Sequence, residues 1–272
     1  ASETLTYYAQ ILKDTKKKSN ILKNDNLDDP VTLADLTVNE MIINRINENY
    51  QGVNWEILSE ENVKSSILNF DLSRDWIWVL DPLDGTKDFL QGTSNYAVHL
   101  ALNYKQRPII GVVLIPEREE LWIAIGNDIW CEKRNGKIFR PNLSKNKMLK
   151  EMVLVTSKNH RNETLKNLIE KLNLKEVKIM GSIGCKIASI VRGDCDIYIC
   201  LSLPGKSSPK DWDFAAPEAI LKASGGAITT LDNKEITYCK SSLEQGGIIV
   251  ASNNSTAHKD ICLEIKGIIK KY

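Results

Sequence analysis

Strand-like segments follow one another through the first half of the chain with only short turns between them, and this order restricts the fold to few classes. Four of them are "DWIWVLD", "NYAVHLALNY", "RPIIGVVLIP" and "ELWIAIGN", rich in β-branched and aromatic residues. The next segment, "DIWCEKRNGKIF", contains an Asn-Gly pair typical of a β-hairpin turn. A helix precedes the strands, with Thr32 as its N-cap and Asp35 at its third position. We therefore expect this half to be α+β.

The second half alternates strands with helices. A polar stretch, "RPNLSKNKMLKE", separates the two patterns, and we place a domain boundary near residue 145. Beyond it the expected order is strand "MVLVTS", helix "ETLKNLIEKLN", strand "EVKIMG", helix "GCKIASIVRG" and strand "CDIYIC". Helix "DFAAPEAILKAS", two more strands and a closing helix follow. We expect an α+β domain over residues 1–145 and an α/β domain over residues 146–272.

Composition and charge restrict the partners. A chain of 272 residues can bury a sizeable core, and its 36 basic and 35 acidic residues leave a net charge of +1. That balance gives no reason to expect a nucleic-acid or membrane partner, and no apolar run is long enough for a leader or a span. Six cysteines occur without a C-x-x-C pair. We therefore expect reduced thiols and a cytoplasmic protein.

The segment "VLDPLDGTKDF" brings two carboxylates together at a strand end. Asp81 closes the apolar run and Pro82 is expected to stop the strand, so that Asp81 and Asp84 face one point. Gly85 and Thr86 then open a short helix, whose first N–H groups suit a phosphate. Two carboxylates repel a phosphate unless divalent cations lie between them, and Mg²⁺ is the simplest choice.

Three other segments supply further carboxylates. "LSEEN" places Glu60 and Glu61 in a polar turn after a short strand, and "KDWDFAAPEAI" places Asp213 just before a helix. Asp35 lies in the first turn of its helix. Each residue alone is more often a helix cap or a solvated acid, and D-x-x-D-G alone is often an ordinary turn. Together these carboxylates could serve one site with several metal ions.

The motifs "PVT-x-A-D", "SEE", "DPLDGTKDF" and "WD-x-x-A-P-E" occur in an order and spacing that resemble the inositol monophosphatase superfamily of lithium-sensitive, metal-dependent phosphatases. The resemblance extends from about residue 5 to 255. It is closest to the 3'(2'),5'-bisphosphate nucleotidase branch, including the bacterial CysQ type, through "DGTKDF", "VTSKNH" and "GSIGCKIASIVRG". The region "PGKSSPKDWDFAAPEAILKASGG" is also similar, although "SSPKD" is longer here and is expected to alter the site rim. The implied fold is a layered αβαβα sandwich of the inositol monophosphatase and sugar phosphatase type.

The resemblance implies a set of metal ligands, most of them in the first domain. Glu60 and Asp81, with the carbonyl of Leu83, would hold one Mg²⁺ ion. Asp81, Asp84 and Asp213 would hold the second, and Glu60 would assist a third, weaker ion. Two to three Mg²⁺ ions are thus expected, with Mn²⁺ as a substitute and Li⁺, Na⁺ or Ca²⁺ as inhibitors.

It also implies catalytic and substrate-binding residues. Asp35 and Thr86 would orient or deprotonate the attacking water, and Glu60 would assist; Glu61 remains the alternative to Glu60. The expected substrate contacts are Gly85, Thr86, Ser157, His160, Ser182, Lys186 and Asp213.

The other histidines receive structural interpretations. His99 alternates with apolar residues and is expected in the core. His258 opens the closing helix and is expected at the surface, and Trp212 is expected to brace Asp213.

The favoured activity is hydrolysis of the 3'-phosphate of adenosine 3',5'-bisphosphate, and by extension of its phosphosulfate, to give AMP from the former, within sulfur metabolism. Hydrolysis of inositol mono- or polyphosphates remains open, because the same metal and phosphate machinery would serve it. A regulator that binds a phosphorylated ligand without catalysis is the third reading. The protein is expected to act as a monomer or homodimer.

Overall fold

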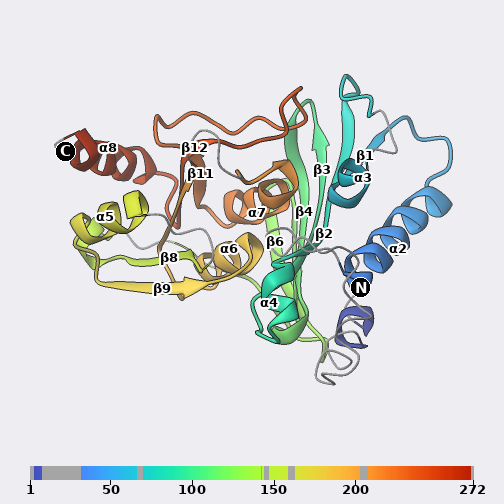
Figure 1. Cartoon of the computed structure of the whole chain (residues 1–272), viewed down its shortest axis with the longest axis horizontal. Coiled ribbons are helices and arrows are strands. Elements are labelled where there is room, and N and C mark those ends of the chain that lie inside the picture. Colours follow the sequence, from blue (N-terminus) through green and yellow to red (C-terminus); the bar gives the residue numbers. More distant parts are fainter. Residues whose placement is uncertain are drawn as a thin grey trace.

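The computed structural model describes residues 3–7, 32–65, 70–141, 143, 147–158, 163–202 and 208–270. In this part of the chain, two sheets have helices between them and on both outer faces (Figure 1). The layered αβαβα sandwich that the resemblance implied is confirmed.

The first sheet contains the strands of the first half, in chain order. They are β1 (Glu56–Ser59), β2 (Trp76–Asp84), β3 (Ala97–Tyr104), β4 (Arg107–Ile115), β5 (Glu120–Ile125), β6 (Asp128–Lys133) and β7 (Ile138–Phe139). β1 pairs with β2 in parallel, and the later neighbours are antiparallel. The short turn between β6 and β7 contains the Asn-Gly pair, so the predicted hairpin is confirmed.

The second sheet is mixed and has the order β11-β12-β10-β8-β9. Its strands are β8 (Val153–Ser157), β9 (Glu176–Met180), β10 (Ile197–Ser202), β11 (Ala227–Thr230) and β12 (Gly247–Ser252). β10, β8 and β9 run parallel, so their carboxyl ends meet at one edge of the sheet.

The helices form the remaining layers. They are α2 (Leu33–Asn49), α3 (Glu60–Lys64), α4 (Thr86–Leu90), α5 (Glu163–Lys171), α6 (Ile183–Val191), α7 (Asp211–Ala223) and α8 (His258–Lys270), and residues 3–7 are also helical. Helices α6 and α7 lie between the sheets, α2 lies outside the first sheet, and α5 and α8 lie outside the second (Figure 1).

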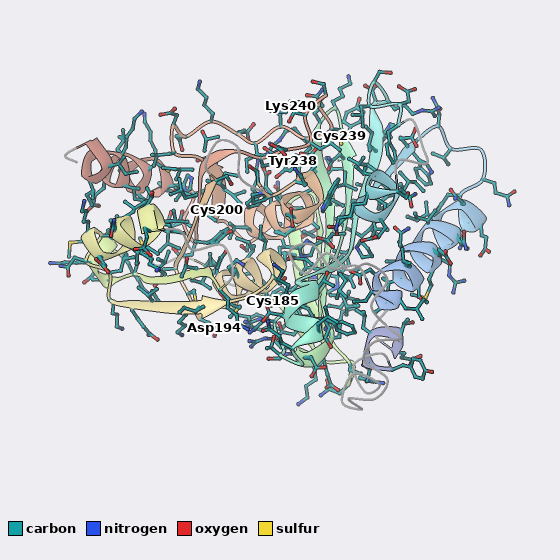
Figure 2. All side chains as sticks on the ribbon, in the orientation of Figure 1. Cys185, Asp194, Cys200, Tyr238, Cys239 and Lys240 are labelled. Atoms are coloured by element: carbon teal, nitrogen blue, oxygen red, sulfur yellow. The ribbon has the colours of Figure 1, made fainter. Side chains whose placement is uncertain are left out.

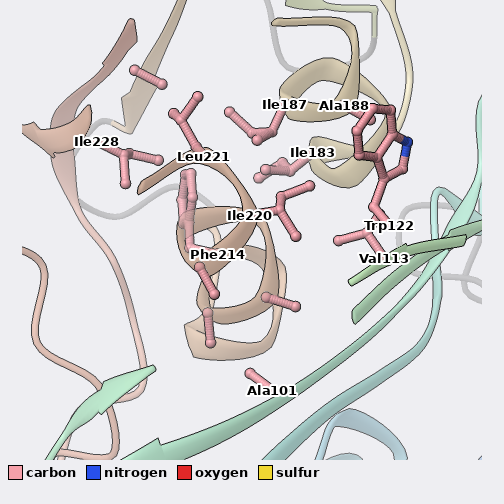
Figure 3. Close-up of a cluster of buried hydrophobic side chains, with 14 of the residues drawn as sticks. Ala101, Val113, Trp122, Ile183, Ile187, Ala188, Phe214, Ile220, Leu221 and Ile228 are labelled. Atoms are coloured by element: carbon pink, nitrogen blue, oxygen red, sulfur yellow. The ribbon is translucent and has the colours of Figure 1, made fainter. Parts of the chain in front are cut away.

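Three hydrophobic clusters join these layers. The largest lies between the two sheets, where Val113 and Trp122 of the first sheet face side chains of α6 and α7, among them Ile187 and Phe214 (Figure 3). A second cluster joins α2 to the outer face of the first sheet, and a third joins α5 and α8 to the second sheet. Apolar side chains at alternate positions of β2 and β3 belong to the first and the second cluster, because successive side chains of a strand point to opposite faces of the sheet.

Some local predictions were wrong. "SEE" begins helix α3 instead of a polar turn, and Asp213 lies inside the first turn of α7 instead of before it. Pro82 does not end β2, because it lies in an irregularity of the pairing with β3 and beyond the last residue paired with β1. His258 is buried because α8 packs against the second sheet, where Ser252 and Thr229 form hydrogen bonds with its two ring nitrogens.

Other predictions held or lie beyond the described residues. All six cysteines are free and buried; Cys185 lies on α6 and Cys200 on β10 (Figure 2). Among the described residues, no helix combines the length and apolar character needed to cross a membrane. The domain boundary near residue 145 falls among residues 144–146, outside the described residues, and stays a prediction.

Candidate metal centre

Three aspartates from two parts of the fold converge at one point. Asp81 and Asp84 lie at the end of β2, and Asp213 lies in the first turn of α7. One carboxylate oxygen from each lies within 4.8 Å of the others. A cluster of oxygen donors alone suits a hard divalent cation such as Mg²⁺, so the residues present fit the metal that the sequence predicted.

The chain conformation at the end of β2 fixes the Asp81 carboxylate and the Leu83 carbonyl. Asp81 is buried, and its Oδ1 accepts a hydrogen bond of 3.0 Å from the Leu83 N–H. The Leu83 carbonyl lies 3.1 Å from the Thr86 hydroxyl oxygen, at the start of α4. Gly85 between them has φ +95°, and a Cβ there would press on the Asn95 carbonyl, so this tight turn requires glycine.

The start of α6 holds one oxygen of Asp84. Oδ2 accepts hydrogen bonds from the Ser182 hydroxyl at 2.6 Å, from the Gly184 N–H at 3.1 Å and from the Ile183 N–H. The positive end of a helix favours a carboxylate at this position. Because these contacts all involve Oδ2, Oδ1 remains for a cation.

His99 contacts this cluster through Asp84. The residue is fully buried, as predicted for a core histidine, and it pairs with Asp81 across β2 and β3. Its Nδ1 lies 3.2 Å from the Trp212 carbonyl, and its Nε2 lies 3.2 Å from Asp84 Oδ2. Sequence reasoning missed this contact, although the expected pairing of the two strands could have revealed it.

Glu60 contacts the cluster from α3. Its side chain is hydrogen-bonded to Asp81, and its Oε1 lies 2.9 Å from the Lys64 ammonium. Glu60 lines the cavity that contains the aspartates, whereas Glu61 is buried and is not among the described lining residues. The geometry therefore favours Glu60 over Glu61 as a ligand.

Burial makes the cluster electrostatically unfavourable without cations. It raises the pKa of Asp81 and of Asp213 well above the usual range, and the neighbouring charges of Glu60 and Asp84 add to both shifts. A bound cation stabilises the ionised carboxylates and reverses these shifts. The raised pKa values are thus a second observation that fits a metal site.

Asp35 lies beside the cluster and contacts Thr86. The Asp35 Oδ1 accepts a hydrogen bond of 3.1 Å from the Thr86 hydroxyl, and its Oδ2 accepts the Thr32 N–H at 2.8 Å. The predicted capping box between Thr32 and Asp35 is confirmed. Burial raises the pKa of Asp35 to about 7, while the hydrogen bonds from Thr32 oppose this shift. A carboxyl with such a pKa can exchange a proton near neutral pH.

A cavity of about 350 Å³ opens over these residues. It is bounded on one side by the carboxyl ends of β8, β9 and β10, at Ser157, Met180 and Ser202. Its lining includes five lysines, namely Lys64, Lys87, Lys158, Lys186 and Lys210.

The predicted substrate contacts fall into two groups. Most of them line the cavity, namely Gly85, Thr86, Ser157, Ser182, Lys186 and Asp213. His160 lies outside the described residues. The Ser182 hydroxyl is already engaged by Asp84 and by the Cys185 N–H, which makes it a support for α6 and Asp84.

The fold and the acidic site together define a class, the metal-dependent phosphomonoesterases. Residues 1–269 match the inositol monophosphatase family, and the chain belongs to it. The chain is 33% identical over 234 residues to the 3'(2'),5'-bisphosphate nucleotidase CysQ of Buchnera aphidicola, covering 85% of this chain and 82% of that protein.

Solved structures agree on the fold. An inositol monophosphatase of Thermotoga maritima superposes with a TM-score of 0.71 at 22% identity, covering 99% of this chain and 96% of that one. A phosphatase for inositol monophosphate and NADP, complexed with Mg²⁺ and phosphate, gives a TM-score of 0.71 at 20% identity, covering 96% of this chain and 92% of that one. Members of the family use Mg²⁺ and bind small phosphorylated substrates.

Proposed function

We propose that the protein is a cytoplasmic Mg²⁺-dependent nucleotidase that removes the 3'-phosphate of adenosine 3',5'-bisphosphate, giving AMP and phosphate. The phosphosulfate analogue of that nucleotide fits the same proposal. The similarity to a CysQ bisphosphate nucleotidase supports this choice of substrate. The observation that carries it is the environment of Lys186.

Lys186 is a buried cation on the cavity wall. Its side chain is only 3% exposed, and its Nζ lies 3.5 Å from the Met180 carbonyl and 5.5 Å from the centre of the Tyr198 ring. Burial lowers the pKa of this ammonium, and the nearby charges of Asp84 and Asp88 offset that effect only in part. A further anion would stabilise the buried ammonium, so Lys186 supports a substrate with a second anionic group.

The rest of the cavity favours a nucleotide over a polyol. The metal site would take the phosphate that is cleaved, and inositol 1-phosphate has no second phosphate to offer Lys186. Met180, Ile183 and Leu201 give the wall apolar surface, which suits a purine ring better than a ring covered with hydroxyl groups.

The proposed metal ligands are those that the sequence resemblance implied, and the clustering of Asp81, Asp84 and Asp213 supports them. Glu60, Asp81 and the Leu83 carbonyl would hold one ion, and Asp81, Asp84 and Asp213 would hold another. When bound, Mg²⁺ neutralises phosphate charge and lowers the pKa of a water molecule. The Gly85 and Thr86 N–H groups at the start of α4 would bind the phosphate oxygens.

Asp35 and Thr86 would orient the attacking water and accept its proton. An ionised Asp35 accepts the Thr86 hydroxyl hydrogen, which leaves a lone pair of that oxygen free to accept a hydrogen bond from the attacking water. The hydroxyl thus orients the water, and Asp35 can take up the proton as the bond to phosphorus forms. Phosphoryl transfer needs mainly such positioning and charge neutralisation.

Replacement of Lys186 tests the choice of substrate. For Lys186→Met we expect the KM for adenosine 3',5'-bisphosphate to rise at least about tenfold, since one charge-assisted contact is worth about 1.5–3 kcal/mol. The KM for adenosine 3'-monophosphate should change little, because that substrate lacks the second phosphate. Lys166→Met, an exposed lysine of α5, is the matched control. An equal loss with both substrates would contradict the proposal.

A further inference from the structure

Lys64 places a positive charge beside the metal ligands. It is the last residue of α3, one helical turn after Glu60, which is the first. Its Nζ lies 2.9 Å from Glu60 Oε1, and the two side chains are 26% and 17% exposed. The Glu60 side chain is also hydrogen-bonded to Asp81.

An ordinary exposed pair at this spacing contributes little to stability. This pair differs because both residues line the cavity that contains Asp81, Asp84 and Asp213. The Lys64 charge also reaches Asp213, where it opposes the larger rise in pKa that burial causes. The Lys64 ammonium therefore acts on Asp213 as well as on Glu60.

Two divalent cations and the Lys64 ammonium together carry as many positive charges as the five carboxylates beside them carry negative ones. Five carboxylates meet here, those of Asp35, Glu60, Asp81, Asp84 and Asp213. Two divalent cations compensate four of these charges, and the ammonium compensates the fifth. A third divalent ion at Glu60 would meet an ammonium already paired with that carboxylate.

We propose that Lys64 is a resident counter-cation of Glu60 and limits the site to two divalent ions. The inference rests on the proposed metal-dependent function and adds to it a residue that sets how many ions bind. Lys64 acts through Glu60 and is thus a positioning residue. Its loss should open a third cation position next to Glu60.

Equilibrium dialysis of the full chain against Mn²⁺, with the bound metal counted per chain, tests this proposal without an activity assay. We expect two ions for the wild type and for Lys64→Arg, which keeps the charge. Lys64→Met and Lys64→Gln should bind a third ion at Mn²⁺ concentrations at least about tenfold below any at which the wild type binds one. Lys166→Met, which removes a lysine paired with Glu163 on α5, should behave as wild type.

Each other outcome has one meaning. Equal numbers and affinities in wild type, Lys64→Met and Lys64→Gln would overturn the role of Lys64 while leaving the metal site intact. Three ions in the wild type, or a third ion in Lys64→Arg, would overturn it as well. No bound Mn²⁺ in any of the proteins would instead overturn the metal-dependent function on which the inference rests.

Discussion

The two oxygens of Asp84 have different surroundings, and this difference explains how one residue can serve both the fold and the site. Oδ2 accepts hydrogen bonds from the start of α6 and faces His99. One of the Asp84 oxygens lies within 4.8 Å of carboxylate oxygens of Asp81 and Asp213. An amide at this position keeps one oxygen for α6 but removes a charge from the cluster.

We therefore expect Asp84→Asn to lower the phosphatase rate at least about 100-fold while the fold survives. Phosphate release at saturating Mg²⁺ measures the rate, and circular dichroism measures the fold. Asp232→Asn, at an exposed carboxylate paired with Lys266, is the control. Near-normal turnover of the Asp84 variant would contradict its assignment as a metal ligand.

At the scale of single elements, the capping box of α2 links helix stability to catalysis. Thr32 accepts hydrogen bonds from the Ala34 and Asp35 N–H groups, and its own N–H donates to the Asp35 carboxylate. The same carboxylate contacts Thr86 through its other oxygen. The cap that starts the helix thus also fixes Asp35.

Thr32→Ala should lower the free energy of unfolding by about 1–2 kcal/mol, as for other lost N-caps. It should also raise the pKa of Asp35 above its present value of about 7, because the hydrogen bond from the Thr32 hydroxyl, which alanine lacks, now opposes the effect of burial. The acid limb of the pH-rate profile should move to higher pH. Urea denaturation and the pH-rate profile check these effects, and Thr32→Ser should preserve wild-type behaviour.

Sequence patterns predicted the helices and strands more accurately than the residues at which they end. The Thr32 cap, the β6–β7 hairpin and the strand-helix alternation were predicted because local residues determine them. The strand end at Pro82 was wrong because pairing partners, which are distant in sequence, decide where a strand stops. The contact of His99 with Asp84 depends on strand register, and the environment of Lys186 depends on packing between helix and sheet.

At the scale of the molecule, the acidic site joins the first sheet to helix α7. Asp81 and Asp84 come from the first sheet, whereas Asp213 comes from α7, which packs between the sheets. Cations bound here would connect the two halves of the chain. Binding to the folded state alone raises its stability.

We expect Mg²⁺ to raise the Tm, and to raise it more at pH 8 than at pH 5.5. The folded-state pKa of Asp35 is about 7, and those of Asp81 and Asp213 are also raised. The metal-free folded state therefore binds more protons than the unfolded chain. Through these groups it loses stability as the pH rises from about 4 through the folded-state pKa values. Thermal unfolding with and without Mg²⁺ measures the effect; Asp213→Asn should reduce the gain, and a larger gain at pH 5.5 would contradict the account.

The most direct measurement is phosphate release from adenosine 3',5'-bisphosphate and from inositol 1-phosphate at equal concentrations, each with Mg²⁺ and with EDTA. We expect Mg²⁺-dependent release at least about tenfold faster from the nucleotide. Faster release from inositol 1-phosphate would contradict the assigned substrate. Release from neither substrate would contradict catalysis and favour a regulator that only binds a phosphorylated ligand.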